Sequence, residues 1–189
     1  FIQATGNYAM HLALSYKNTP YRGVVLIPEK GELWFAYEDK VWVENKEGSK
    51  FKVNLNKNKS LQEMTLVTSK NHRNDALKSL IQKINFKDVM IMGSIGCKIA
   101  SIVRGDSDIY ICLSLPGKSC PKDWDFAAPA TILKAAGGAI TNINNKELSY
   151  NKSNFEQGGI IVATNNNLNH REICIEVKEI IRRFEIYPL

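Results

Sequence analysis

The chain shows two different patterns of apolar and polar positions. Up to about residue 45, short runs rich in aromatic and β-branched residues alternate with turns, as in "NYAMHLALSY", "RGVVLIPEK", "ELWFAYED" and "KVWVEN". Runs of this kind, joined by short turns, predict strands that pair in sequence order. We therefore expect an antiparallel β meander over residues 1–60.

From residue 61 onward, the pattern predicts strands that alternate with helices. Strands are expected at "MTLVTS", "DVMIMG", "DIYICLS" and "GGIIVAT", with a short strand through Ile140. One helix is expected to begin at Asn74, and a second to run through "SIGCKIASIVRG" and end at Gly105. The last helix carries an apolar stripe: Ile173, Val177, Ile180, Ile181 and Phe184. This alternation predicts an α/β domain over residues 61–189.

The composition is that of a soluble globular protein, with 44% hydrophobic and 23% charged residues among 189. No apolar run approaches the roughly 20 residues of a membrane-spanning helix, and no signal peptide is recognisable. We expect a cytoplasmic protein without a membrane partner. The four cysteines have no metal-site spacing and predict reduced thiols: Cys97, Cys112, Cys120 and Cys174.

The net charge of +6 raises the question of a nucleic-acid partner. Several lysines lie in "NKEGSKFKVNLNKNKS", which we interpret as a solvated loop, and no zinc-finger or RNA-binding signature accompanies them. The positive charge equally suits an enzyme whose small substrate carries phosphate groups. We expect such a substrate and no nucleic acid.

A buried helix is predicted in "KDWDFAAPATILKAAGG". Because proline fits best in a first turn, Pro129 predicts a helix that starts near Asp125 or Phe126. Asp125 then lies at the positive end of the helix dipole, where it either caps free N–H groups or binds a hard cation such as Mg²⁺. Trp124 is expected to anchor the backbone beside this carboxylate, and both interpretations of Asp125 stay open.

A second candidate segment is "GSIGCK", which places Ser94, Gly96 and Lys98 at the start of a helix. Small residues there let backbone N–H groups approach a phosphate, which serine and lysine side chains can also contact. The spacing is not that of a P-loop. Ser94 as an ordinary N-cap, Lys98 as an exposed helix lysine and His72 as a polar loop residue remain alternatives.

Together these segments resemble the inositol monophosphatase superfamily of Mg²⁺-dependent, lithium-sensitive phosphatases. "WDFAAPATILKAAGGAIT" is similar to its C-terminal signature, and "TSKNHRN", "GSIGCKIA" and "FIQATGNYAMHLALSYKNTPYRGVV" are most similar to the 3'(2'),5'-bisphosphate nucleotidase subgroup. The resemblance implies a sugar-phosphatase-like α/β sandwich with αβαβα layers. It also implies that Asp125 is a metal ligand and that His72, Ser94, Gly96 and Lys98 contact the substrate.

The chain departs from the family pattern at its beginning. An upstream glutamate and an Asp-Pro-hydrophobic-Asp-Gly-Thr segment, which supply further metal ligands and a catalytic threonine in the family, have no counterpart here. One carboxylate cannot complete an octahedral site of oxygen ligands. We therefore expect the chain to be the C-terminal portion of a phosphatase, with no catalytic residue of its own and the catalytic residues upstream of Phe1.

The resemblance implies removal of the 3'-phosphate of adenosine 3',5'-bisphosphate, a by-product of sulfate activation, with two or more Mg²⁺ ions. An inositol or sugar monophosphatase of the same superfamily is an alternative, and a catalytically inactive nucleotide-binding module is another. Superfamily members are often dimers, so a homodimer is compatible with the resemblance. If helices normally cover the meander, its outer face should expose apolar side chains.

Overall fold

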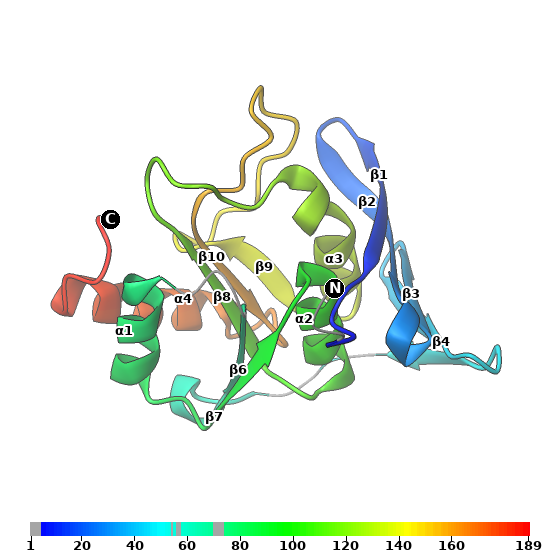
Figure 1. Cartoon of the computed structure of the whole chain (residues 1–189), viewed down its shortest axis with the longest axis horizontal. Coiled ribbons are helices and arrows are strands. Elements are labelled where there is room, and N and C mark those ends of the chain that lie inside the picture. Colours follow the sequence, from blue (N-terminus) through cyan, green and yellow to red (C-terminus); the bar gives the residue numbers. More distant parts are fainter. Residues whose placement is uncertain (1–4, 54, 56–57, 70–73) are drawn as a thin grey trace.

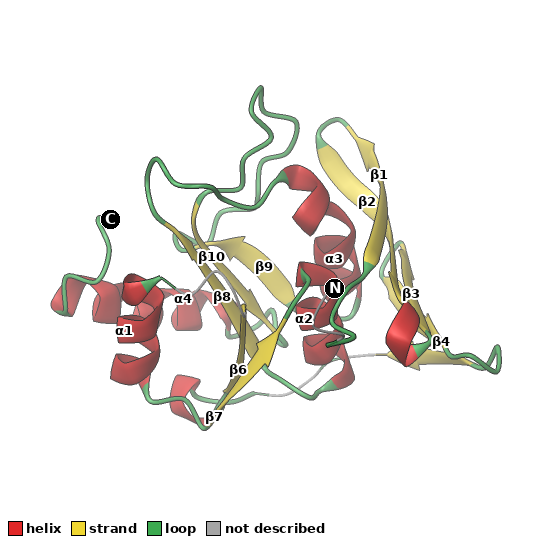
Figure 2. Cartoon of the chain, viewed as in Figure 1, coloured by secondary structure: helices red, strands yellow, loops and turns green. Residues whose placement is uncertain are grey.

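The computed structural model describes residues 5–53, 55, 58–69 and 74–189. Two five-stranded sheets organise these residues, and helices lie between the sheets and against the far face of the second one (Figure 1). The two sheets differ in type: the first is an antiparallel meander and the second is mixed (Figure 2). This arrangement confirms the predicted α/β sandwich.

The first sheet has strands in the order β1-β2-β3-β4-β5, each paired antiparallel with the next. The strands are β1 (Met10–Tyr16), β2 (Thr19–Ile27), β3 (Glu32–Tyr37), β4 (Lys40–Glu44) and β5 (Lys50–Val53). A short 3₁₀ turn, η1 (Pro28–Lys30), joins β2 to β3. The predicted meander is confirmed. Its last strand was not expected, because the lysine-rich segment was interpreted as a loop. Phe51 and Val53 give that segment the alternation that pairs it with β4.

The second sheet has the order β7-β6-β8-β10-β9, in which β6 pairs parallel with β7 and β8. The strands are β6 (Thr65–Ser69), β7 (Asp88–Met92), β8 (Ile109–Ser114), β9 (Ala139–Asn142) and β10 (Gly159–Thr164), and the 3₁₀ turn η2 (Leu61–Glu63) precedes them. β10 pairs antiparallel with both β8 and β9. All five predicted strands of this half are present.

Four helices complete the fold: α1 (Asp75–Ile84), α2 (Ile95–Arg104), α3 (Asp123–Ala135) and α4 (His170–Arg183). The Asn74 side chain accepts a hydrogen bond from the Leu77 N–H at 2.9 Å, which confirms the predicted start of α1. Gly105 ends α2 in the left-handed region, at φ 87°, also as predicted. The last helix ends at Arg183, so Phe184 falls outside it and is 42% exposed, contrary to the predicted stripe.

Two hydrophobic cores define the layers. One core joins the inner face of the first sheet to α2, α3 and one face of the second sheet; Trp34, Ile102, Phe126 and Ile161 are among its members. The other core lies between the opposite face of the second sheet and helices α1 and α4. The described residues thus form four layers in the order β, α, β, α. The meander shares its core with α2 and α3, and the division into residues 1–60 and 61–189 stays a prediction.

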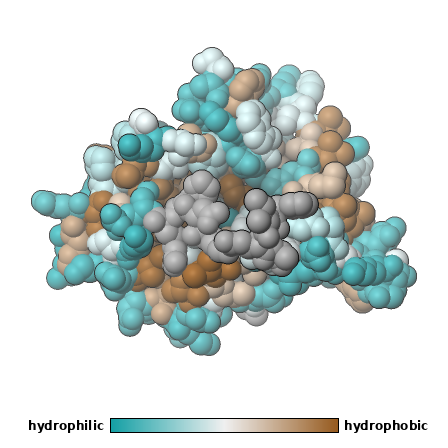
Figure 3. Space-filling view, in the orientation of Figure 1, coloured by the Kyte–Doolittle hydropathy of each residue, from teal (hydrophilic) through white to brown (hydrophobic). Residues whose placement is uncertain are grey.

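The outer face of the first sheet is apolar and open among the described residues. Four side chains that alternate along β1 point to it and are at least half exposed: Met10, Leu12, Leu14 and Tyr16. Phe35 on β3 and Trp42 on β4 stack on each other, with ring centroids 5.4 Å apart. Brown side chains along the right-hand edge of Figure 3 mark this side of the molecule. This exposure matches the prediction for an uncovered meander. Helices of the predicted outer layer are not among the described residues.

A glycine sets how closely the first sheet approaches the helices beneath it. A Cβ atom at Gly23 on β2 would lie 2.6 Å from the carbonyl oxygen of Ala128 on α3. Only glycine therefore allows this strand and helix to touch through their backbones. Arg104 adds a polar link between the same layers, because it pairs with Glu32 at 2.6 Å and with Asp106 at 2.8 Å. Its pairing with Asp106 ties the end of α2 to the turn that follows the helix.

The cysteines and the helices bear on two further expectations. All four cysteines are free thiols; Cys97 and Cys174 are buried, and Cys112 and Cys120 are partly buried. The prediction of reduced thiols is consistent with this. Within the described part of the chain, none of the helices has the length and apolar character needed to cross a bilayer.

Candidate functional site

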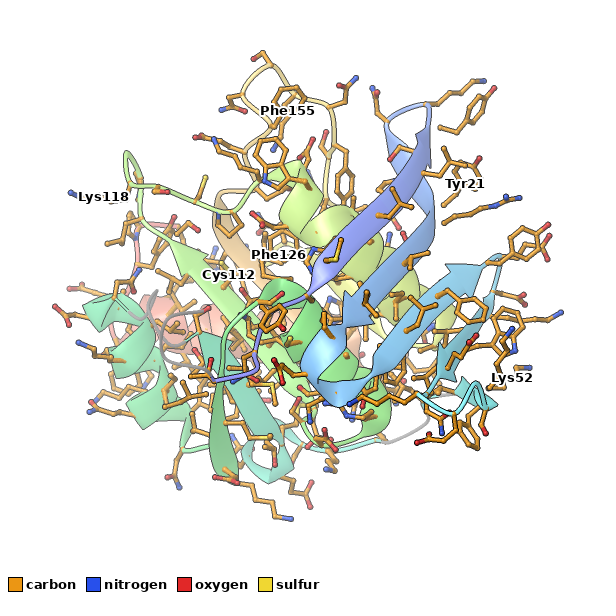
Figure 4. All side chains as sticks on the ribbon, turned by 45° about the vertical axis from the view of Figure 1, so that its right-hand side comes forward. Tyr21, Lys52, Cys112, Lys118, Phe126 and Phe155 are labelled. Carbon is orange, nitrogen blue, oxygen red and sulfur yellow. The ribbon has the colours of Figure 1, made fainter. Side chains whose placement is uncertain are left out.

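A cleft of about 740 Å³ opens where α2 and α3 begin, beside the end of β8. We call it the central cleft. Side chains from β6, β8, α1, α2 and the 115–121 loop line it together with Asp125 of α3; they include Ser69, Asn74, Ser94, Lys98, Tyr110, Cys112, Lys118 and Cys120. Figure 4 shows Cys112 deep between these elements and Lys118 on the loop at the outer end. The cleft therefore collects polar groups from both candidate segments of the sequence.

Lys98 is the most unusual group in the central cleft. Its residue is only 3% exposed, although lysines are rarely buried without a partner. The Nζ atom donates to the carbonyl oxygen of Gly93 at 2.7 Å and lies 5.4 Å from the centre of the Tyr110 ring. Among the described residues, no carboxylate lies within ion-pair distance of this ammonium group. The alternative of an exposed helix lysine is therefore wrong.

Burial shifts the ionisation of Lys98 and its neighbours. Desolvation lowers the pKa of Lys98 to about 8, because the charged form has lost water without gaining an ion-pair partner from the described part of the chain. The same burial raises the pKa of the Cys112 thiol and of the Tyr110 hydroxyl, so both groups stay neutral at pH 7. Lys98 is thus the cation at the floor of the central cleft, and an anion bound there would restore its missing partner.

Asp125 lies in the first turn of α3, and one of its oxygens has a structural partner. Oδ2 accepts a hydrogen bond of 2.8 Å from the backbone N–H of Lys122. The residue is partly exposed and lines the central cleft. Asp125 therefore caps the helix through Oδ2, while its carboxylate still faces the cavity. The capping interpretation and the metal interpretation are compatible in this geometry.

The start of α3 differs from the prediction. The helix begins at Asp123, so Pro129 lies in its interior and not in its first turn. A proline there costs a backbone hydrogen bond. Every residue from Phe126 to Leu133 is buried, and packing on both sides of the helix offsets this cost. Trp124 lies in the first turn of α3. It is 61% exposed, so the expectation that it anchors the backbone was wrong.

Ser94 and Gly96 meet His11, a residue that the sequence did not single out. Ser94 precedes α2, and its Oγ lies 3.4 Å from Nε2 of His11; the other ring nitrogen, Nδ1, lies 3.4 Å from the carbonyl oxygen of Trp124. Both distances are long for hydrogen bonds. Gly96 is buried under the imidazole and does not line the central cleft. His11 thus connects β1 with the starts of α2 and α3.

The predicted residues therefore have different positions. Ser94, Lys98 and Asp125 line the same cleft, Gly96 supports it from below, and His72 lies outside the described residues. His11, Tyr110 and Cys112 were missed. His11 had one signal in the sequence: it is a polar residue between Ala9 and Ala13 on the inner face of the strand.

Among the described residues that line the central cleft, Asp125 is the one carboxylate that could bind a metal ion. No group of three or more His, Cys, Asp or Glu side chains with metal-site geometry occurs in the described ranges. Mg²⁺ prefers six oxygen ligands and often keeps several waters, so Asp125 fits as one ligand of such an ion and does not complete its shell. The described residues therefore fit as part of a divalent-cation site, with Asp125 as the ligand they contribute.

Comparison with known proteins gives a consistent result. A model of the inositol monophosphatase family matches residues 1–182. The 3'(2'),5'-bisphosphate nucleotidase CysQ of Buchnera aphidicola is 31% identical over 153 residues, which cover 81% of this chain and 54% of that protein. The 3'(2'),5'-bisphosphate nucleotidase 1 of Mus musculus is 34% identical over 103 residues, or 53% of this chain and 32% of that protein. The chain thus spans about half of the bacterial relative's length and a third of the mouse relative's.

Solved structures show the same fold. CysQ from Bacteroides thetaiotaomicron superposes with a TM-score of 0.72 at 23% identity, over 88% of this chain and 66% of that one. An inositol monophosphatase from Zymomonas mobilis superposes with a TM-score of 0.75 at 20% identity, over 95% of this chain and 65% of that one. At these identities the likeness establishes the fold alone.

Proposed function

Since this chain belongs to the inositol monophosphatase family, we propose that it acts in the hydrolysis of phosphate monoesters, with the 3'-phosphate of adenosine 3',5'-bisphosphate as the group removed. AMP and phosphate would be the products. The names of the bacterial and mouse relatives support this choice of substrate. A cytoplasmic location and a role in sulfur metabolism belong to the same proposal.

One observation carries the proposal: the buried ammonium group of Lys98, which has no counter-ion among the described residues, shares a cleft with the Asp125 carboxylate, whose Oδ2 caps α3. Lys98 and Asp125 both line the central cleft. Ser94, the residue immediately before α2, lines it as well. A phosphate group offers the oxygens that Lys98 lacks. The cleft volume of about 740 Å³ is in the range that encloses a nucleotide-sized ligand.

Each side chain has a definite task in this proposal. Lys98 neutralises part of the phosphate charge, and the Ser94 hydroxyl is available to hydrogen-bond a phosphate oxygen. The start of α3 adds the positive end of its dipole. The apolar wall formed by Leu77, Leu113 and Leu115 offers a surface for the nucleoside. Gly96 contributes indirectly, because it lets His11 approach the start of α2. His72 is kept as a proposed substrate contact on the resemblance alone.

Family membership implies dependence on a divalent metal ion, and we propose Mg²⁺ with Asp125 as one of its ligands. When bound, such an ion stabilises negative charge on the oxygens of the transferring phosphoryl group. Capture of an attacking water and lithium sensitivity are expected from the resemblance, and no described residue is assigned to them. A homodimer is likewise only compatible with the family.

Binding and turnover should be measured separately. Isothermal titration of this chain with adenosine 3',5'-bisphosphate, with and without Mg²⁺, tests recognition, and release of inorganic phosphate tests hydrolysis. We expect saturable binding that is at least about tenfold weaker in Lys98→Met, since a charged hydrogen bond contributes about 1.5–3 kcal/mol. Lys40→Met, an exposed lysine that lines neither cavity, is the matched control. Equal binding by both variants and the unaltered chain would contradict the proposal.

The alternatives give different results in the same experiments. An inositol or sugar monophosphatase would prefer inositol 1-phosphate to the nucleotide. A catalytically inactive nucleotide-binding module would bind the nucleotide at Lys98 and release no phosphate under any metal condition. A nucleic-acid-binding module would bind long single strands with a steep salt dependence and without dependence on Lys98.

A further inference from the structure

A second pocket adjoins the central cleft and has no role in the function proposed above. It encloses about 480 Å³ between the inner face of β1, the start of α3 and the 149–157 loop. We call it the lateral pocket. His11 lines it and also contacts Ser94 of the central cleft. We propose that the lateral pocket binds a planar heteroaromatic ring of nucleobase size, at a site separate from Lys98.

Small side chains make room for a flat ring. Ala13 and Ser15 line the pocket from β1, and Ala127 and Ala128 line it from α3. Side chains this short leave a slot between strand and helix. The volume lies within the range of small-molecule pockets. The floor of the lateral pocket is thus shaped for a thin ligand.

The opposite wall is aromatic and is held in place at a conformational cost. Trp124 and Phe155 are 61% and 42% exposed, and their ring centroids lie 5.9 Å apart at an angle of 44°. Phe155 has φ of 56°, a left-handed conformation that bulky residues rarely adopt. Its carbonyl accepts from the Asp123 N–H at 2.8 Å, and its own N–H donates to Lys152. The loop therefore presents this ring beside the β1–β2 hairpin, over the start of α3 (Figure 4).

A buried hydroxyl in the lateral pocket lacks a partner. Tyr150 lines the pocket, and its Oη is inaccessible to solvent and makes no hydrogen bond with any described residue. Buried polar atoms nearly always have a partner, so an unpaired one needs an explanation. Because this Oη is closed to solvent, the Tyr150 side chain has to turn toward the pocket before a nitrogen or oxygen at the edge of a bound ring can supply that partner. A purely hydrocarbon ring would not.

The charges around the lateral pocket argue against a cationic ligand. Both oxygens of Asp123 are already engaged: Oδ2 accepts from the Asn151 N–H, and Oδ1 accepts from Nε2 of Gln157, each at 2.6 Å. At the far rim, Asn151 donates to Asn18 at 2.9 Å, which joins the hairpin tip to the loop, and Lys17 stands beside it. A neutral heterocycle fits these surroundings better than an amine does.

Fluorine NMR of the chain labelled with 5-fluorotryptophan tests the proposal directly. Trp124→Phe identifies the Trp124 resonance, which is then followed during titration with adenosine, an uncharged nucleoside. We expect a saturable shift of Trp124 and none of the buried Trp34. Phe155→Ala should weaken the affinity about tenfold through lost stacking. Tyr150→Phe, which removes only the hydroxyl, should weaken it about three- to tenfold.

Two control variants separate this site from the others. Lys98→Met alters the central cleft and should leave the Trp124 titration unchanged, whether or not the chain releases phosphate. Tyr21→Ala removes another exposed aromatic residue that lines neither cavity, and it should also have no effect. The proposal is overturned if Trp124 does not respond to adenosine. It is equally overturned if Lys98→Met abolishes the response while Phe155→Ala and Tyr150→Phe retain it.

Discussion

The imidazole of His11 lies directly on Gly96. A Cβ atom at Gly96 would be 2.3 Å from Nε2 of His11 and 2.9 Å from a methyl carbon of Val25. Residues 85 positions apart in the sequence are thus in backbone-to-ring contact, and this contact brings β1 against the start of α2. Ser94 of the central cleft lies beside the same ring, with its Oγ 3.4 Å from Nε2 of His11.

Gly96→Ala should therefore destabilise the protein. Overpacking a filled site costs about 1–3 kcal/mol, and the added methyl group here meets both a ring and a buried strand. Chemical denaturation of the variant measures the loss. His11→Ala in the same chain should recover part of it, because the imidazole is the nearest obstacle. If the double variant loses as much unfolding free energy as the two single variants lose together, the His11–Gly96 contact is not the cause of the destabilisation.

Lys98 should make anion binding depend on pH. Its pKa of about 8 means that the ammonium form predominates below pH 8 and is lost as the pH rises through that value. The affinity for inorganic phosphate or for adenosine 3',5'-bisphosphate should accordingly fall between about pH 7 and pH 9. Isothermal titration across this range measures the effect. Lys98→Met should bind weakly at every pH, with this part of the dependence removed.

A buried histidine far from the cleft should make stability depend on pH in the acidic range. His170 accepts or donates hydrogen bonds of 2.8 Å with Thr141 and Thr164, and desolvation lowers its pKa from 6.5 to about 4. Between these values the unfolded chain binds a proton that the folded chain does not. Stability should therefore fall as the pH drops below 6.5, by about 2 kcal/mol between pH 7 and pH 5.

Urea denaturation at both pH values tests this expectation. His170→Gln should be less stable at pH 7 but should lose less on acidification. His11 has its pKa lowered by burial as well, so His11→Gln measures that second contribution. An identical acid response in the unaltered chain and in His170→Gln would show that other groups control it.

Local pattern predicted most of the fold, because most elements carry their own signals. Asn74 predicted the start of α1, and the buried residues Leu77, Leu80 and Ile84 follow it at helical spacing. The start of α3 was misjudged because tertiary packing outweighed the local preference of Pro129 for a first turn. Propensity rules contain no information about how completely a helix will be enclosed.

The site was only partly predictable for a similar reason. "GSIGCK" and "WDF" are contiguous motifs, so Ser94, Lys98 and Asp125 could be chosen from the sequence. His11 belongs to no motif and acquires its neighbours only when β1 lies across α2 and α3. The burial of Lys98 also depends on elements distant in the sequence, since Tyr110 of β8 covers its side chain. The periodicity of apolar residues carries no information about contacts between residues so far apart in the sequence.

Asp125 offers a way to separate capping from metal binding with two substitutions. Its Oδ2 accepts the N–H of Lys122, a role that an amide oxygen can also fill. Asp125→Asn should therefore keep the cap and stay within about 0.5 kcal/mol of the original stability, whereas Asp125→Ala should lose about 1 kcal/mol. Both variants remove the negative charge that a divalent cation requires. Mg²⁺-dependent strengthening of nucleotide binding should thus disappear in Asp125→Asn although its melting temperature is unchanged. If that strengthening survives in Asp125→Asn, the carboxylate serves only the helix, and the proposal that it binds metal is wrong.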